Sequence, residues 1–396
     1  MNFILVDFSK FKENLLPLTY FRPVSGILSG IMTLKEKWEF FLNQSCSYLT
    51  EPYLQEKYPV QYEDENIYIN PVFFPNKNLI KIIQNLKKGE KLIAQNKTIA
   101  IHAGESSLQE LENTDFKEIN YEYVVDGIFS LPDIFKKNSQ QIISDFNLLF
   151  HKQNPLNLLS KTNTIIGKEP IFLNSGAQVE ASIFNSQEGP IYIGKNVKIL
   201  EGSMLRGPLA ILDDSVIKMG AKIYGGTSIG KSCKVGGEIK EVVFFGNSNK
   251  GHDGYLGDSV IGEWCNLGAD TNNSNLKNNY SNVKLWNYSQ KDFVDTGIQF
   301  CGLIMGDHSK SGISTMFNTG TVVGVNSNIF GSGFQPKYIP SFQWGGEKKF
   351  VDYKFEKAME VAQAVMGRRN IKFDEIEKRL FIKVYNKVQN IEKNIK

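Results

Sequence analysis

The sequence predicts an α/β domain, then a solenoid of short β-strands, and last a helical tail. Three observations predict this order. Short apolar runs alternate with amphipathic stretches over residues 1–157, large aliphatic residues recur at every sixth position within residues 158–335, and helical spacing returns in residues 336–396. With 396 residues, the chain is long enough for more than one hydrophobic core.

The composition is typical of a globular protein without a targeting segment, since 41% of the residues are hydrophobic and 22% are charged. The N-terminal stretch has no basic lead or small-residue cleavage site, and no apolar run reaches about 18 residues, so we expect a cytoplasmic protein that binds no membrane. A net charge of +3 is small for a nucleic-acid binder. The four cysteines lack Cys-x-x-Cys spacing and are expected to be buried free thiols.

Residues 1–157 predict an open α/β sheet. The stretches "NFILVDF", "ENIYINPVFF" and "KTIAIHAG" have the apolar, β-branched and aromatic character of strands. Between them, "GIMTLKEKWEFFL" and "NKNLIKIIQNLKK" have the spacing of amphipathic helices. This alternation of strands and helices is typical of an α/β sheet with helices against its faces.

The solenoid is predicted from a strict period of six. The eight aliphatic residues of the series are Ile193, Ile199, Leu205, Ile211, Ile217, Ile223, Ile229 and Val235. On an α-helix they would circle the axis, because each step of six turns the side chain by about 240° net. In short strands that turn a corner every six residues, they all point inward, and stacked coils bury them together. The stretch "NKGHDGYLGD", residues 249–258, interrupts this rhythm.

The repeats "IYIGKN", "TSIGKS" and "SVIGEWCNLGAD" resemble the hexapeptide repeats of left-handed parallel β-helix acyltransferases. The whole chain resembles the family of bifunctional N-acetylglucosamine-1-phosphate uridylyltransferase/glucosamine-1-phosphate N-acetyltransferases, and within it a divergent group of sugar nucleotidyltransferases. The resemblance implies a nucleotidyltransferase-like, Rossmann-like N-terminal domain on a left-handed β-helix. It also implies a homotrimer with sites between subunits and a transferase of UDP-N-acetylglucosamine biosynthesis that uses acetyl-CoA as acyl donor.

The stretch "KGHDGYLGDSVIGEWCNLGADTN" resembles the catalytic region of that family. The resemblance places His252 at the catalytic histidine and Ala269 at a backbone contact with acetyl-CoA. The candidate contacts to the sugar phosphate or its amine are Lys250, Tyr255, Asn266, Asn279, Tyr280, Lys284 and Arg206. Lys284 is displaced by one residue from the family pattern, and Asp253-Gly254 replaces the usual residues, which leaves the acceptor sugar open.

The expected chemistry requires these residue types independently. Acetyl transfer from a thioester to an amine requires a base with a pKa near neutrality, and histidine is that side chain. A sugar phosphate requires cations, which lysine and arginine supply. No metal site is expected in the solenoid, because only His252 and His308 lie there and a zinc site of the three-imidazole type needs one more.

The N-terminal domain carries an incomplete second set of motifs. "LLPLTYFRPVSGI" resembles the Pro-Leu-Thr-x-x-Arg-Pro-Lys element of sugar nucleotidyltransferases, and the candidate nucleotide contacts are Thr19, Arg22, Lys37 and Asp126. The loop "VDFSKFKEN" has no glycine to let main-chain N–H groups cradle a phosphate, and its lysines, Lys10 and Lys12, are expected to be mobile. "YINPVFF" lacks the family's metal-binding aspartate. We expect little nucleotidyl transfer, and Mg²⁺ would be needed only if this domain is active.

Two other functions remain open from the sequence. The protein is alternatively an active sugar-1-phosphate nucleotidyltransferase, of the UDP-sugar pyrophosphorylase type, whose β-helix serves as a trimerisation scaffold. The third alternative is a trimeric scaffold without chemistry.

Overall fold

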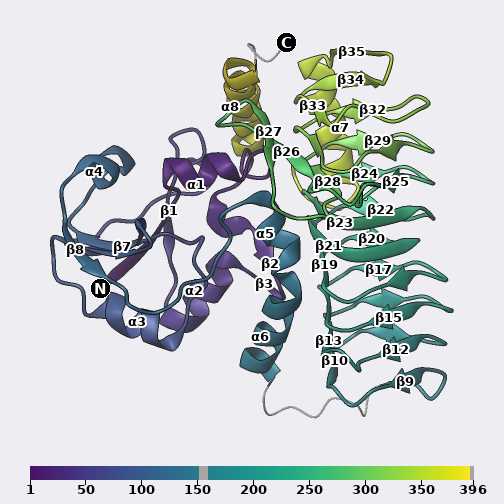
Figure 1. Cartoon of the computed structure of the whole chain (residues 1–396), viewed down its shortest axis with the longest axis horizontal. Coiled ribbons are helices and arrows are strands. Elements are labelled where there is room, and N and C mark those ends of the chain that lie inside the picture. Colours follow the sequence, from purple (N-terminus) through teal and green to yellow (C-terminus); the bar gives the residue numbers. More distant parts are fainter. Residues whose placement is uncertain (151–158, 393–396) are drawn as a thin grey trace. The chain divides into compact units, whose positions relative to one another are not determined.

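The computed structural model describes residues 1–150 and 159–392 (Figure 1). The chain divides into two compact units. The first is Met1–Ile27, Met32–Ser130 and Asp374–Val384, and the second is Leu28–Ile31, Leu131–Phe373 and Tyr385–Lys396. The expected boundary between residues 157 and 158 lies outside the described residues. The expected domains, 1–157, 158–335 and 336–396, stay a prediction.

The first unit contains a six-stranded sheet in the order β4-β1-β5-β7-β6-β8. Its strands are β1 Asn2–Val6, β4 Ser47–Leu49, β5 Asn66–Ile69, β6 Glu90–Ala94, β7 Lys97–Ala103 and β8 Lys117–Asn120. The helices that lie wholly within this unit are α1 Ser9–Asn14, α2 Leu34–Leu42, α3 Lys77–Gln84 and α4 Leu108–Asn113. Strands β4, β1 and β5 are parallel, whereas β7 is antiparallel to both β5 and β6. The α/β class is confirmed, with a mixed rather than wholly parallel sheet.

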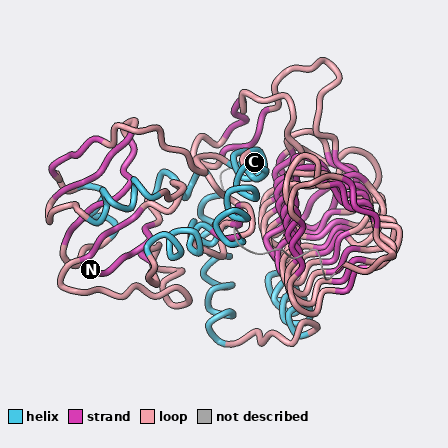
Figure 2. Tube along the Cα trace, turned by 90° about the horizontal axis from the view of Figure 1, so that it is seen from below, coloured by secondary structure: helices cyan, strands magenta, loops and turns pink. Residues whose placement is uncertain are grey.

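The second unit is a β-solenoid with three faces of short parallel strands, and Figure 2 shows its coils nearly in projection. The first face consists of β9 Thr164–Ile166, β12 Ile183–Asn185, β15 Met204–Arg206, β18 Lys222–Ile223, and the beginnings of β21 Glu238–Gly246 and β23 Tyr255–Ile261. Strands β21 and β23 bend around a corner, because their later residues pair with strands of the second face. The predicted β-helix is confirmed.

The other two faces complete each coil. The second face consists of β10 Ile171–Leu173, β13 Ile191–Ile193, β16 Leu209–Ile211, β19 Thr227–Lys231, the ends of β21 and β23, β28 Leu303–Met305, β31 Thr321–Val323 and β33 Tyr338–Ile339. The third consists of β11 Gln178–Val179, β14 Lys198–Ile199, β17 Val216–Ile217, β20 Lys234–Val235, β22 Asn249–Lys250, β24 Asn266–Leu267, β29 Lys310–Ser311, β32 Asn328–Ile329 and β34 Gln343–Gly346. At its end β35 Lys349–Asp352 pairs antiparallel with β34.

The core of the solenoid is the predicted column of aliphatic side chains. All eight residues of the six-residue series are buried in one hydrophobic cluster, so their inward orientation is confirmed. Cys233, Cys265 and Cys301 are buried in this unit and Cys46 in the first, and all four are free thiols, as predicted.

The stretch at residues 249–258 does not interrupt the stack, contrary to the sequence-based expectation. Asn249 pairs with Lys234 on one side and Asn266 on the other, and Lys250 pairs with Val235. Lys250 follows Val235 by only 15 positions, whereas Val235 follows Ile217 by 18. A shortened coil therefore shifts the sequence rhythm, while the side chain of Lys250 takes the inward position.

The true insertion is an arm that leaves the stack between β25 (Asn272–Asn273) and β28. It contains an antiparallel hairpin of β26 (Lys284–Asn287) and β27 (Asp292–Asp295). The ring of Trp286 stacks on that of Tyr338, with centroids 4.2 Å apart, which holds the hairpin against the solenoid. Strand β25 continues the first face by pairing with β30 (Met316–Phe317).

Helices cover parts of the solenoid. They are α5 Leu131–Lys136, α6 Asn138–Phe150 and α7 Phe355–Gly367. The chain continues into α8 Glu375–Glu392, which belongs to the first unit up to Val384 and to the second from Tyr385. Asn138 fixes the start of α6, because its Nδ2 donates to the carbonyl of Gly226 and to Oγ of Ser228. The predicted helical tail is confirmed by α7 and α8. None of the helices in the described ranges combines the length and the apolar character that a membrane-spanning helix needs.

Candidate functional site

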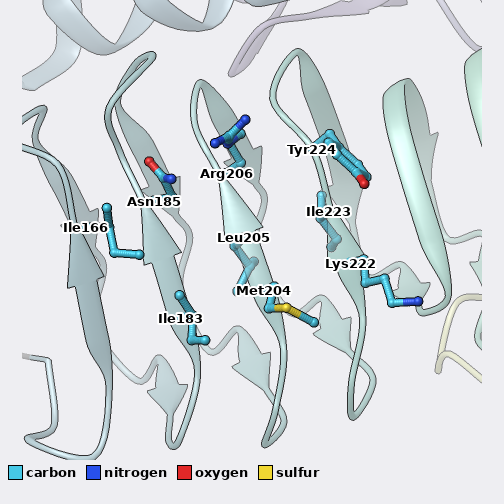
Figure 3. A pocket seen from close by; sticks show the side chains of 9 residues that line it. All are labelled: Ile166, Ile183, Asn185, Met204, Leu205, Arg206, Lys222, Ile223 and Tyr224. Atoms are coloured by element: carbon cyan, nitrogen blue, oxygen red, sulfur yellow. The ribbon is translucent and has the colours of Figure 1, made fainter.

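The outer surface of the first face carries two rows of side chains, because paired residues on neighbouring parallel strands point to the same side. One row contains Ile183, Met204, Lys222, Glu238 and Tyr255. The second begins with Ile166, Asn185 and Arg206. Figure 3 shows Arg206 and Tyr224 beside one another above the first row. Apolar side chains and the cations Lys222 and Arg206 therefore share this face, with Glu238 between Lys222 and Tyr255.

A shallow cavity of about 280 Å³ lies on these rows. Its lining residues are Ile166, Ile183, Asn185, Met204, Leu205, Arg206, Lys222, Ile223 and Tyr224. Met204 is 43% exposed and Ile183 is 40% exposed, which is unusual for large apolar side chains in adjacent strands. Arg206 forms an exposed ion pair with Glu188 at 3.2 Å.

His252 lies in the corner that joins the third face to the first, between β22 and β23, and its side chain is exposed. Lys250 supports this corner from inside, because its buried ammonium donates to the carbonyls of His252 at 2.9 Å and Asp253 at 3.2 Å. Burial lowers the pKa of Lys250 to about 8. The side chain predicted to contact a substrate phosphate therefore lies within the solenoid.

The neighbouring coils fix the main chain on both sides of His252. The N–H of Glu238 donates to the carbonyl of Gly254 at 3.2 Å, and the N–H of Asp270 donates to that of Asp253 at 3.0 Å. Gly254 has a φ of +117°, and an added Cβ would lie 2.4 Å from the carbonyl oxygen of Thr271. The corner therefore requires glycine here, and it presents the imidazole from a fixed backbone.

Tyr255 is linked to a buried carboxyl group on the same strand. Nδ2 of Asn275 donates to the hydroxyl of Tyr255 at 2.9 Å and to Oδ2 of Asp258 at 2.5 Å. The ring of Tyr255 lies back over Gly257, where an added Cβ would be 2.3 Å from its hydroxyl. Burial raises the pKa of Tyr255 to about 12, and the charge of Asp258 acts in the same direction. The phenol therefore stays protonated at neutral pH.

Asp258 is an unusual carboxyl group. Burial raises its pKa from 3.8 to about 6, Glu241 raises it further, and the hydrogen bond from Asn275 and the charge of Lys240 oppose this shift. The folded chain thus holds this proton more tightly than the unfolded chain. The free energy of unfolding falls as the pH rises from about 4 to about 6, by up to about 3 kcal/mol.

We expect Asp258→Asn to stabilise the protein at pH 7.5 by about 1–3 kcal/mol and to give no gain at pH 4, because it removes the buried charge. Asparagine keeps an oxygen that accepts from Asn275 and tolerates the φ of +48° at this position. Thermal unfolding at the two pH values measures the effect. A lower melting temperature of the variant at pH 7.5 contradicts the assignment.

Two other candidate residues lie elsewhere on the solenoid. Asn266 points outward from β24 on the third face, and its Oδ1 accepts from Nδ2 of Asn249 at 3.4 Å. Ala269 lies in the following corner, where its carbonyl accepts from the N–H of Ser314 at 2.8 Å. Asn266 and Tyr255 therefore occupy different faces within one chain.

The remaining solenoid candidates belong to the arm. Asn279 is exposed, and its Oδ1 accepts from the N–H and the hydroxyl of Ser281. Tyr280 is 65% exposed and has a φ of +56°. Lys284 is exposed at the start of β26, paired with Asp295. These three residues lie in the arm, and none of them pairs with the strand that carries Tyr255.

In the first unit, three of the four candidate nucleotide contacts are buried. Thr19 donates to the carbonyl of Lys12 at 3.1 Å, and Nη1 of Arg22 donates to the carbonyl of Leu18 at 3.0 Å. Lys37 is 2% exposed, with its ammonium 6.0 Å from the centroid of the Phe74 ring. Asp126 is exposed, and its Oδ1 accepts from the N–H of Gly127.

The segment "VDFSKFKEN" also differs from the expectation, because the side chain of Lys12 is buried and ion-paired. This lysine lies in α1, is 2% exposed, and its ammonium is 3.3 Å from Oδ2 of Asp7 and 3.4 Å from Oε1 of Glu51. Oδ1 of Asp7 accepts from the N–H of Val24 at 2.8 Å. This buried network ties the segment to the "RPV" turn in place of a phosphate cradle.

The structure adds two cations that sequence reasoning missed. Lys222 lines the cavity, and Lys240 pairs with Gly257, the residue over which Tyr255 lies. The ammonium of Lys240 is 5.5 Å from the centroid of the exposed Phe300 ring. In the sequence these two lysines stand directly beside inward-facing aliphatic residues, at positions where the six-residue repeat points side chains outward.

The comparisons with known proteins follow the two parts of the chain. Residues 3–154 match the family model described as "Sugar nucleotidyl transferase". The bifunctional protein GlmU of Methanococcus maripaludis strain C5 is 29% identical over 287 residues, which is 67% of this chain and 62% of that protein. The GlmU of Methanocaldococcus jannaschii is 34% identical over 120 residues, which is 30% of this chain and 26% of that protein.

The chain is similar to the bifunctional GlmU proteins. This confirms the resemblance drawn from its motifs. A second kind of relative is the "Putative uncharacterized acetyltransferase YaiX" of Escherichia coli K12, which is 27% identical over 149 residues, or 37% of this chain and 64% of that protein. The matches to the two GlmU proteins span about a quarter and about three fifths of those relatives' lengths.

Proposed function

We propose that the protein is a transferase that moves an acetyl group from acetyl-CoA to the amine of an amino-sugar phosphate, with His252 as general base. The observation that supports this most directly is the exposed imidazole on a fixed corner, three residues before Tyr255 and beside a face that carries both cations and the carboxylate of Glu238. The similarity to GlmU proteins and to an acetyltransferase supports the same class of reaction.

The imidazole of His252 takes the proton that the amine loses as its nitrogen bonds to the thioester carbonyl carbon. The carbon–sulfur bond then breaks, and the departing thiolate receives a proton from the imidazolium. The products are an N-acetylated sugar phosphate and free coenzyme A. Lys222, Lys240 and Arg206 hold the phosphate by charge-assisted hydrogen bonds.

In this proposal, a neighbouring copy of the chain supplies the residues that complete the site for the sugar phosphate and acetyl-CoA. Tyr255 and Asn266 lie on different faces of one chain. The Ala269 corner that would contact acetyl-CoA stacks on the His252 corner, where the N–H of Asp270 donates to the carbonyl of Asp253. In this proposal, Tyr255 and Asn266 serve one site from two different chains. The exposed apolar side chains of the first face give a reason for such copies to associate, and we propose a homotrimer.

We expect Met204→Asp to dissociate this trimer and to abolish acetyl transfer, because it places a charge among the exposed apolar side chains of the first face. Light scattering measures the mass. Met219→Asp is the matched control, since Met219 is 70% exposed and does not line the cavity. A wild-type protein that is a stable, active monomer contradicts the proposal.

The match of residues 3–154 to sugar nucleotidyl transferases supports a second candidate, nucleotidyl transfer by the first unit. Mg²⁺ would neutralise developing phosphate charge in that reaction, and Asp126 would be its carboxylate ligand. The burial of Thr19, Arg22 and Lys37 argues against efficient turnover. Pyrophosphate release from UTP and a sugar 1-phosphate, lost in Asp126→Ala, would favour this candidate, with the β-helix as scaffold.

A further inference from the structure

A second, polar cavity of about 440 Å³ lies between the third face of the solenoid and the end of α7. Its lining residues are Lys234, Asn247, Asn249, Trp264, Cys265, Asn266, Lys310, Val365, Arg368 and Arg369. Four of these carry a positive charge, and none is an aspartate or a glutamate. The cavity shares no residue with the His252 corner, and Asn266 is the one residue that it has in common with the proposed acetyl-transfer site.

The floor of the cavity is a row of outward side chains. Neighbouring strands pair Lys234 with Asn249, Asn249 with Asn266, and Asn266 with Lys310. Adjacent strands lie about 4.8 Å apart, so the row is about 14 Å long, with a lysine at each end and two amides between them.

Arg369 closes the cavity from the side of the helix. Its Nη2 donates to Oδ1 of Asn249 at 2.9 Å, and its Nη1 donates to the carbonyl of Ser232. Nδ2 of Asn249 in turn donates to Asn266, which leaves Nδ2 of Asn266 as the amide donor of the row. The guanidinium is thus held over the middle of the row by neutral acceptors.

The cations of the cavity have no carboxylate partner among the described residues of the chain. Lys310 is largely enclosed, and its ammonium donates to the carbonyl of His308 at 2.7 Å. Burial lowers the pKa of Lys310 to about 8. Enclosing an ammonium without a negatively charged partner is unfavourable, and an anion bound beside it offsets this cost.

We propose that this cavity binds a small molecule through a phosphate or diphosphate group. Lys234 and Lys310 contribute charge from the two ends of the row, Arg369 contributes its planar fork, and Asn266 contributes a neutral donor. A cavity of this size under a helix accommodates a small ligand, and the wall formed by Trp264 gives an apolar surface beside the anion.

The test is calorimetric titration of the full chain with inorganic diphosphate and with inorganic phosphate. We expect one site per chain, and Lys310→Met and Arg369→Met each to weaken binding at least about ten-fold through loss of a charge-assisted hydrogen bond. Lys198→Met is the matched control, because Lys198 lies in the same outward row on β14 but outside the cavity. It should bind within about two-fold of wild type.

Lys310→Met is the decisive variant. Methionine fills the same space without a buried charge, so this variant should unfold at the same temperature as wild type or higher. Preference for diphosphate over phosphate identifies a diphosphate as the ligand group, and the reverse identifies a single phosphate group. Binding that is unchanged in both cavity variants, or that is equally weak in all four proteins, overturns the proposal. No acetyl donor is present, so this outcome is independent of the acetyl-transfer assay.

Discussion

Replacement of His252 by alanine is expected to lower acetyl transfer by about 10² to 10⁴-fold, which is the usual contribution of a positioned general base. The side chain is exposed and its backbone is held by the neighbouring coils, so the variant should fold normally. Release of free thiol from acetyl-CoA in the presence of an amino-sugar phosphate measures the rate.

The matched control is Asp253→Ala, which truncates the next exposed side chain of the same corner and keeps the carbonyl that Lys250 contacts. It should retain most of the activity. Because alanine leaves an open space where the imidazole was, added imidazole should restore part of the activity of His252→Ala. A folded His252→Ala protein with the wild-type rate contradicts the general-base assignment.

The second large effect concerns stability. Ile217→Asp places an unpaired carboxylate among the buried aliphatic side chains of the solenoid and removes a fully buried isoleucine. The expected loss is on the order of 5 kcal/mol, which is comparable to the whole stability of many domains. We therefore expect the solenoid to be unfolded at 25 °C, as measured by circular dichroism and urea titration.

The adjacent residue gives the control for this variant. Val216 is on the same strand but points outward, so Val216→Asp exposes its charge to water and should change the stability by less than about 1 kcal/mol. If both variants melt at the wild-type temperature, the inward assignment of the six-residue series is wrong.

The core of the solenoid could be predicted because each coil repeats one geometric requirement, an inward aliphatic side chain. The repeat failed as a guide at Lys250, where the coil is shorter and a lysine replaces the aliphatic residue. Its hydrocarbon stem packs like an aliphatic side chain, while its ammonium reaches the main-chain carbonyls of the next corner. Periodicity alone cannot distinguish this arrangement from an interruption.

The candidate site was only partly predictable. His252 and Tyr255 are close in sequence and lie at one corner. Asn266 points outward from a different face, because the chain bends between strand β23, which carries Tyr255, and strand β24, which carries Asn266. From the sequence alone, Lys222 and Lys240 cannot be distinguished from ordinary surface lysines. Only the strand pairing shows that they lie in the rows that end near Tyr255. In the polar cavity Arg369 contacts Asn249, which precedes it by more than a hundred residues. A local sequence motif cannot predict a contact between residues so far apart in the chain.

The most direct test of the proposed activity is thiol release from acetyl-CoA by the purified protein across a panel of amino-sugar phosphates, with pyrophosphate release from UTP measured in parallel. The proposal predicts thiol release that depends on the amino-sugar phosphate, is lost in His252→Ala, and is accompanied by little or no pyrophosphate release. Robust pyrophosphate release from a sugar 1-phosphate and Mg²⁺, without any acceptor-dependent thiol release, would contradict it.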